Sequence, residues 1–165
     1  MEEKIELRQI LRSRRQSLKE ADRDKKSFAI ANQLISIDNW PSSTGIAVYS
    51  ATDGEVDPKY IAKVARVSGK KLFLPIVNEE GKLDFAPWRK KDRLVFNRFN
   101  ILEPSRSSSS AKVGEISIIC LPLVGWDRSL NRLGMGGGFY DKTLSNLSAE
   151  FCLVGLGFSI QEVED

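Results

Sequence analysis

A loop with four glycines in five positions constrains this chain more than any other feature of its sequence. Gly134, Gly136, Gly137 and Gly138 lie in the eleven-residue stretch 131–141, here called the glycine loop. Glycine loses much conformational entropy when it is ordered, and it alone readily adopts positive φ angles or lets another group approach the backbone closely. Such a loop is therefore either a flexible solvent loop or a loop whose backbone N–H groups face a ligand.

The segments on either side favour a ligand. The apolar run 116–124 precedes the glycine loop and is typical of a buried strand, and residues 140–147 can begin a helix. A strand, a glycine-rich loop and a helix in this order turn N–H groups toward an anion. Arg132 would add a charged fork for phosphate, and Asp141 a hard oxygen ligand for phosphate-bound Mg²⁺. The sequence predicts a phosphate site.

Two well-known phosphate motifs do not fit this loop. A dinucleotide-binding G-x-G-x-x-G would need glycine where Phe139 stands. A P-loop ends in Gly-Lys-Ser/Thr, whereas Lys142 and Thr143 follow Asp141 here. The glycine loop is thus a phosphate loop of another kind, or a solvent loop.

Composition restricts the chemistry further. The 165 residues include no histidine and two cysteines, which excludes Ser-His-Asp triads, Cys-His pairs and an imidazole base, and argues against structural zinc. Catalysis must use carboxylates, Lys, Arg, Tyr, backbone dipoles or a hard metal ion. Reactions driven by ATP and Mg²⁺ suit this inventory, because they depend mainly on positioning and electrostatics.

The chain is typical of one soluble domain. It is 41% hydrophobic and 28% charged, as in ordinary globular proteins, and it contains no apolar run near the ~18 residues that span a bilayer. Cys120 and Cys152 lie in apolar runs, which predicts buried thiols and a cytoplasmic protein. The start at Met1–Lys4 has no signal-peptide character.

The charge pattern points to small partners. Net charge is +3, and the basic residues of 4–26 are interleaved with acidic ones. Interleaving argues against a nucleic-acid stripe and favours amphipathic helices with solvated faces. We expect a monomer that binds small anionic molecules and neither nucleic acid nor membrane.

Apolar periodicity predicts alternating helices and strands. Ser17–Glu20 fits a capping box, Asp57 an N-cap, and Pro87 an edge strand. The expected helices are 2–16, a second from the capping box at 17–20 toward 35, 58–67 and 140–147, and the expected strands are 46–49, 71–77, 83–88, 116–121 and 151–158. This order predicts an α/β fold: a three-layer single domain with a mostly parallel central sheet flanked by helices.

Such sheets bind ligands at the carboxyl ends of their strands. The polar loop 49–55 follows one expected strand, and the segment 125–141 follows another. Both should open on the same edge of the sheet.

The segments Leu121–Asp127 and Asn131–Asp141 closely resemble the 5-formyltetrahydrofolate cyclo-ligase family (methenyltetrahydrofolate synthetase). Three more pieces match in the same order: Lys4–Arg8, Tyr49–Asp57, and Ile101–Pro104, which resembles the loop before the family's penultimate strand. The resemblance covers nearly the whole chain, and the glycine loop is its specific part.

The resemblance implies ATP-dependent closure of 5-formyltetrahydrofolate to 5,10-methenyltetrahydrofolate, with ATP as co-substrate and Mg²⁺ as cofactor. Arg132 and Asp141 would be catalytic, with Asp141 on the metal. Residues implied at ATP are Lys4, Arg8, Arg132, Leu133, Gly134, Met135, Gly136, Gly137, Gly138, Phe139 and Tyr140. Residues implied at the folate are Ser50, Glu55, Met135, Gly136, Gly137, Gly138 and Phe139.

Several side chains keep a plainer interpretation. Arg12 continues the basic face formed by Lys4 and Arg8 and is expected at the surface. Trp88 and Trp126 are expected to be packing residues rather than stacking platforms. Phe139 and Tyr140 either anchor the following helix to the core or flank the pterin.

The chain also departs from the family pattern. Phe139 stands where tyrosine is common, and Met135 and Gly137 stand where relatives often carry other residues, so backbone contacts are expected there. The family continues into a segment with a second metal-contacting aspartate, while this chain ends at Asp165. We therefore expect one cyclo-ligase-like domain over 1–165 that lacks this segment. A non-catalytic folate- or nucleotide-binding relative is the alternative.

Overall fold

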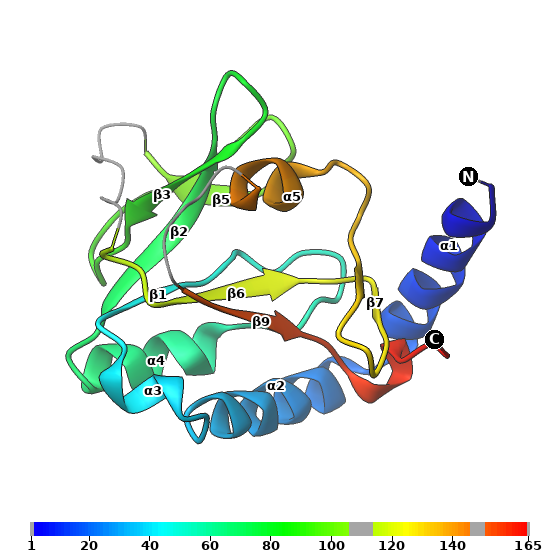
Figure 1. The fold of residues 1–165 in the computed structure, drawn as a ribbon, viewed down its shortest axis with the longest axis horizontal. Coiled ribbons are helices and arrows are strands. Elements are labelled where there is room, and N and C mark those ends of the chain that lie inside the picture. The colour runs from blue at the N-terminus through cyan, green and yellow to red at the C-terminus, as the bar shows by residue number, and fades with distance from the viewer. Residues whose placement is uncertain (1, 106–113, 146–150, 165) are drawn as a thin grey trace.

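The protein is built around a five-stranded sheet (Figure 1). The computed structural model describes residues 2–105, 114–145 and 151–164. The strand order of the sheet is β3-β2-β1-β6-β9. The strands are β1 (Gly45–Ala47), β2 (Lys71–Val77), β3 (Leu83–Pro87), β6 (Ile118–Pro122) and β9 (Cys152–Leu156). All neighbouring pairs are parallel except β2 with β3, which are antiparallel. The predicted mostly parallel sheet is confirmed, and Pro87 lies in an edge strand as expected.

Helices cover both faces of the sheet. They are α1 (Glu2–Ser17), α2 (Glu20–Leu34), α3 (Asn39–Ser42), α4 (Lys59–Val67) and α5 (Phe139–Leu144), with a 3-10 turn η1 (Ser159–Gln161). Helices α2, α3 and α4 lie on one face and α5 on the other (Figure 1). One core cluster joins α2 and α4 to the sheet, and a second, around Phe73 and Ile119, receives Tyr140 and Leu144 of α5. The three-layer α/β arrangement is therefore confirmed.

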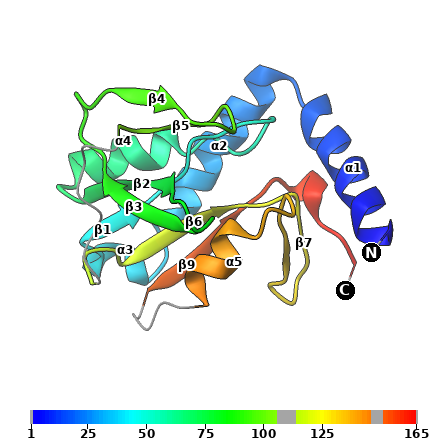
Figure 2. The same ribbon diagram turned by 90° about the horizontal axis from the view of Figure 1, so that it is seen from above.

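Helix α1 stands apart from these layers, beside the end of the chain and the β7 (Gly125–Trp126) segment (Figures 1 and 2). Its Leu11 side chain is fully buried. A Cβ atom at Gly125 would lie 2.6 Å from Leu11 Cδ1, closer than packed carbons approach, so a larger residue here would require the Leu11 side chain to move.

Two short hairpins were not anticipated. Strand β4 (Leu94–Phe96) pairs with β5 (Leu102–Pro104), and β7 pairs with β8 (Arg132–Leu133). The expectation of a loop at 101–104 was therefore wrong. Strands of two or three residues are too short to show an alternating pattern, so the sequence carries no periodic signal for them.

The helix boundaries need correction. The predicted capping box is absent, because Ser17 Oγ donates to the Arg14 carbonyl at 2.7 Å and α2 begins after Lys19 without a side-chain cap. The N-cap of α4 is Pro58 rather than the predicted Asp57, although the Asp57 carboxylate, one residue earlier, accepts the Lys59 N–H at 2.9 Å. Of the helix expected over 140–147, residues 146 and 147 lie outside the described part.

Both cysteines are free thiols, but only Cys120 is buried, and Cys152 is half-buried. Burial raises the pKa of the Cys120 thiol to about 12, so it is inert at neutral pH. Among the described helices, none combines the length and the apolar character needed to cross a membrane.

Candidate active site

The two predicted loops do leave the sheet at the same edge. Strands β1 and β6 are parallel neighbours, with Ile46 opposite Ile118 and Ala47 opposite Ile119. The segments that follow them, 49–55 and 123–141, therefore begin side by side at the carboxyl ends of these strands.

The glycine loop needs glycine for its backbone shape. Gly136 has φ +101° and Gly138 has φ +68°, in the left-handed region that L-residues rarely adopt. Helix α5 starts directly after Gly138 and spans six residues. So short a helix contributes little dipole, and an anion here would depend on loop amides and nearby arginines.

Arg8 joins helix α1 to the glycine loop. Its Nε donates to the Gly134 carbonyl at 2.9 Å, and its guanidinium carbon lies 3.6 Å from the position of a Cβ at Gly136. Lys4 lies one turn earlier and is exposed, with its carbonyl accepting Arg8 Nη1 at 3.4 Å. Contact between Arg8 and the glycine loop matches the expectation that they share a site.

Arg132 and Asp141 form an ion pair across the glycine loop. Arg132 lies in β8 and Asp141 in the first turn of α5. The Asp141 side chain is 75% exposed, so it is open to a cation. The described residues hold no cluster of three or more Asp, Glu, His or Cys side chains suited to a metal. One carboxylate does fit Mg²⁺ that is carried mainly by phosphate oxygens and water.

Glu55 is far more enclosed than its turn-like sequence suggests, with its side chain only 8% exposed. Oε2 accepts the Thr52 N–H at 3.0 Å, and Oε1 lies 3.9 Å from Arg15 Nη1. Burial raises the pKa of Glu55, while the Thr52 hydrogen bond and the Arg15 charge oppose this rise. Ser50 is half-buried just beyond the end of β1.

Two tyrosines with buried hydroxyls lie close enough to Glu55 for its charge to raise their pKa values, although burial is the main cause in each case. The Tyr49 hydroxyl donates to the Val56 carbonyl at 2.8 Å. The Tyr140 hydroxyl is buried and has no hydrogen-bond partner within the described residues. The Tyr140 ring packs on the core beneath α5, so this residue anchors the helix and still leaves its hydroxyl unsatisfied.

An aromatic pair borders the glycine loop. Phe139 meets Phe99, in the turn between β4 and β5, edge to face with ring centroids 5.3 Å apart. Phe99 is 44% exposed. The sequence analysis missed Phe99, because only the fold brings the β4–β5 hairpin to this loop. The other expected packing residues are confirmed: Trp88 packs against the core, and Trp126 Nε1 donates to the Phe158 carbonyl at 3.1 Å.

Two arginines near the end of α1 meet Asp53. Arg12 is at the surface as expected, with its side chain 41% exposed, and pairs with Asp53 through Nε–Oδ2 at 2.8 Å. Arg15, not singled out before, is fully buried and bonds to Asp53 and to the Leu123 carbonyl. Arg15 lies two helical turns after Arg8, hence on the same face. The series of basic residues at 4, 8, 12 and 15 was the signal that could have identified it.

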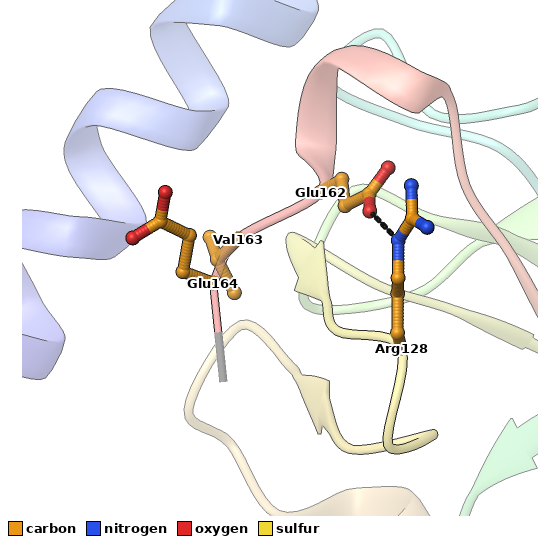
Figure 3. Close-up of a pocket in the computed structure, with 4 residues that line it drawn as sticks. All are labelled: Arg128, Glu162, Val163 and Glu164. Atoms are coloured by element: carbon orange, nitrogen blue, oxygen red, sulfur yellow. Dashed lines mark hydrogen bonds and ion pairs between the residues drawn. The ribbon is translucent and has the colours of Figure 1, made fainter.

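Two surface clefts lie outside the glycine loop. One, between the chain end and the β7–β8 turn, contains the Arg128–Glu162 ion pair at 2.6 Å with Val163 and Glu164 (Figure 3). The other, of about 720 Å³, runs between α2 and the loop 51–57, and Glu55 is one of the residues that line it. The second cleft borders the Glu55 loop; the first is lined by Arg128 of the segment 123–141, but none of its lining residues belongs to the glycine loop.

A three-layer α/β domain with a glycine-rich and an acidic loop at one sheet edge defines a small-molecule-binding α/β protein. The sequence profile of the 5-formyltetrahydrofolate cyclo-ligase family matches residues 1–165, and the chain belongs to this family.

Two individual members of this family are similar in sequence to this chain. The 5-formyltetrahydrofolate cyclo-ligase of Haemophilus influenzae is 30% identical over 97% of this chain and 88% of its own length. That of Escherichia coli K12 is 30% identical over 83% of this chain and 77% of its own length.

Solved structures show the same fold. The NMR structure of Aquifex aeolicus 5,10-methenyltetrahydrofolate synthetase superposes with a TM-score of 0.84 at 28% identity, covering 98% of this chain and 81% of that one. The Mycoplasma pneumoniae 5,10-methenyltetrahydrofolate synthetase superposes with a TM-score of 0.78 at 20% identity, covering 98% and 89%.

Proposed function

We propose that this protein is a 5-formyltetrahydrofolate cyclo-ligase that uses ATP and Mg²⁺ to form 5,10-methenyltetrahydrofolate, ADP and phosphate. One observation carries the proposal beyond family membership. Arg8, Arg132 and Asp141 gather at the glycine loop, on the same sheet edge as the enclosed Glu55.

We assign the nucleotide to the glycine-loop side. Arg8 and Arg132 supply guanidinium groups for phosphate oxygens, and Lys4 adds an exposed ammonium one turn from Arg8. Main-chain N–H groups of 133–140 complete the phosphate contacts. Asp141 would hold the nucleotide's Mg²⁺, whose charge offsets that of the phosphates. Arg132 would then leave its pairing with Asp141 for the phosphate.

We assign the folate to the Glu55 side. A carboxylate that is 8% exposed, with a raised pKa, is costly unless donors meet it. N–H donors of the pterin ring would supply that compensation. We assign Ser50, the Phe139 ring and the unsatisfied Tyr140 hydroxyl, which is close enough to Glu55 for its charge to act on it, to the folate as well. The backbone of 135–138 would lie between the two substrates.

The chemistry follows from holding these substrates together. The formyl oxygen on N5 is a poor leaving group, and the amide carbon is stabilised by resonance. Transfer of the γ-phosphoryl group to this oxygen releases ADP and makes the carbon electrophilic. N10 attacks that carbon, loses its proton, and phosphate departs with the oxygen. The protein's part is to align the two reactants, neutralise charge and exclude water.

The direct test is the appearance of the methenyltetrahydrofolate ultraviolet absorbance from purified protein. We expect it only when ATP, Mg²⁺ and 5-formyltetrahydrofolate are all present, with each omission as a control. Calorimetry that shows folate or nucleotide binding without product would instead establish the non-catalytic relative. If the protein shows no binding of folate or nucleotide and forms no product, both assignments are wrong.

A further inference from the structure

Arg15 occupies an unusual position at the end of α1: a guanidinium group with no solvent exposure. Burying such a charge is costly unless its donors are satisfied and an opposite charge lies close. Nε donates to the Asp53 carbonyl at 3.0 Å, and Nη2 to Asp53 Oδ2 at 2.7 Å. Nη1 donates to the Leu123 carbonyl at 3.0 Å. Arg15 therefore ties the turn at Asp53, in the loop 49–55, to the start of the segment 123–141.

The same network shapes the turn that carries Glu55. Asp53 has φ +53°, a left-handed conformation uncommon outside glycine. Its carboxylate is held by Arg12, Arg15 and Gln16, all from α1. Glu55 closes this turn by accepting the Thr52 N–H. The position of the Glu55 carboxylate thus depends on contacts from α1.

Arg15 also acts on Glu55 through its charge, since Nη1 lies 3.9 Å from Oε1. The other titratable groups that face Glu55 are Asp53 in its own loop, Tyr49 after β1, and Tyr140 on α5. Of these described groups around Glu55, Arg15 is the one that carries a positive charge.

We propose that Arg15 is a positioning residue for the folate substrate: through Asp53 and through its own charge, it holds the Glu55 carboxylate in place and in its charged form. This inference rests on the proposed function, because it requires Glu55 to contact the folate. It also gives α1 two tasks, since Arg8 on the same face meets the glycine loop.

The first test compares Arg15→Gln, Arg15→Lys and a matched control, Arg14→Gln, the neighbouring arginine that is exposed. Steady-state rates give kcat and KM for each substrate. For Arg15→Gln we expect KM for 5-formyltetrahydrofolate to rise on the order of 10-fold or more, with smaller changes in kcat and in KM for ATP. Arg14→Gln should match the wild type.

The pH profile distinguishes positioning from general loosening. Glu55 must be ionised to accept donors, and removal of the Arg15 charge raises its pKa. The acidic limb of kcat/KM for the folate should therefore move to higher pH in Arg15→Gln. Arg15→Lys keeps the charge and should return the limb toward the wild-type position, although its lone ammonium cannot make all three hydrogen bonds. A purely structural role would impair both variants and leave the limb in place.

Asp53→Asn separates the effect of position from the effect of charge. It is also the substitute test if circular dichroism shows that Arg15→Gln does not fold. This change weakens the Arg15–Asp53 ion pair and removes a negative charge near Glu55. KM for the folate should rise without an upward shift of the limb.

Glu55→Gln identifies which assignment fails. If it leaves KM for the folate and the acidic limb unchanged, the proposed role of Glu55 is wrong. If it raises KM and abolishes the limb, while Arg15→Gln and Asp53→Asn behave as the wild type, only the role of Arg15 is wrong.

Discussion

Two tyrosine hydroxyls near Glu55 are both buried but differ in their bonding. Tyr49 donates to the Val56 carbonyl, whereas Tyr140 has no partner in the described part of the chain. An unpaired buried hydroxyl costs folding free energy, and such groups concentrate where a ligand supplies the missing partner. Tyr49 therefore stabilises the protein, whereas we expect the Tyr140 hydroxyl to find its partner in the substrate.

Tyr140→Phe should leave the free energy of unfolding unchanged or raise it by up to about 1 kcal/mol, because it removes an unsatisfied group. The same change should raise KM for 5-formyltetrahydrofolate if the hydroxyl bonds to it. Tyr49→Phe is the matched comparison and should cost roughly 1–2 kcal/mol, since it leaves the Val56 carbonyl unpaired. Urea unfolding and steady-state kinetics measure both effects. Equal losses of stability in the two variants would contradict this distinction.

Arg132→Ala and Asp141→Ala should each lower kcat on the order of 10²-fold or more, because each removes charge stabilisation of phosphoryl transfer. Arg128→Ala is the control: Arg128 lies in the turn between β7 and β8, four residues before Arg132, and forms an ion pair with Glu162 away from the glycine loop (Figure 3). The absorbance assay should show wild-type turnover for this control. Wild-type rates in Arg132→Ala and Asp141→Ala would refute their assignment.

At the scale of elements, the glycine loop depends on backbone angles rather than on side chains. Long elements with a clear period, such as α1 and β2, were predicted to within a few residues. The two hairpins were missed, and with them the placement of Arg132 in a strand and of Phe99 beside Phe139. A hairpin of two- or three-residue strands is formed by its turn bonds and by packing against distant segments, neither of which leaves a periodic pattern.

Gly136→Ala should reduce turnover strongly, because φ +101° is unfavourable for alanine and the loop would shift away from Arg8. Gly69→Ala is the matched control, with φ +70° after α4 and no described atom within 4 Å of an added Cβ. Each variant should lose on the order of 1 kcal/mol of stability. Only Gly136→Ala should lose activity in the absorbance assay. Equal activity in the two variants would show that the loop geometry is not required.

On the scale of the whole molecule, α1 connects parts of the chain that are remote in sequence. Arg8 reaches Gly134, and Arg15 reaches Leu123, across separations of 126 and 108 residues. Leu11 lies between these arginines and is buried against Gly125. Helix α1 thus contacts both the nucleotide side and the folate side of the proposed site.

Leu11→Ala should lower the free energy of unfolding by about 2–5 kcal/mol, because it leaves a cavity beneath α1. It should also raise KM for both ATP and the folate, since α1 carries Arg8 and Arg15. Ile10→Ala, at a 44% exposed neighbour, should change stability by about 0.5 kcal/mol or less. Denaturant unfolding and kinetics check these values. A destabilised Leu11→Ala with both KM values unchanged would show that α1 does not organise the site.

The sequence by itself determined the layer order, the sheet edge with both loops, and the glycine loop with its flanking Arg132 and Asp141. These follow from apolar periodicity and from the backbone freedom of glycine, which are properties of neighbouring residues. Only the tertiary structure decided that Arg15 is buried, that Glu55 is enclosed, and which groups they meet. Burial and hydrogen-bond partners depend on which distant segments pack together, and a charged residue on a helix face looks the same in sequence whether that face meets water or a loop a hundred residues away.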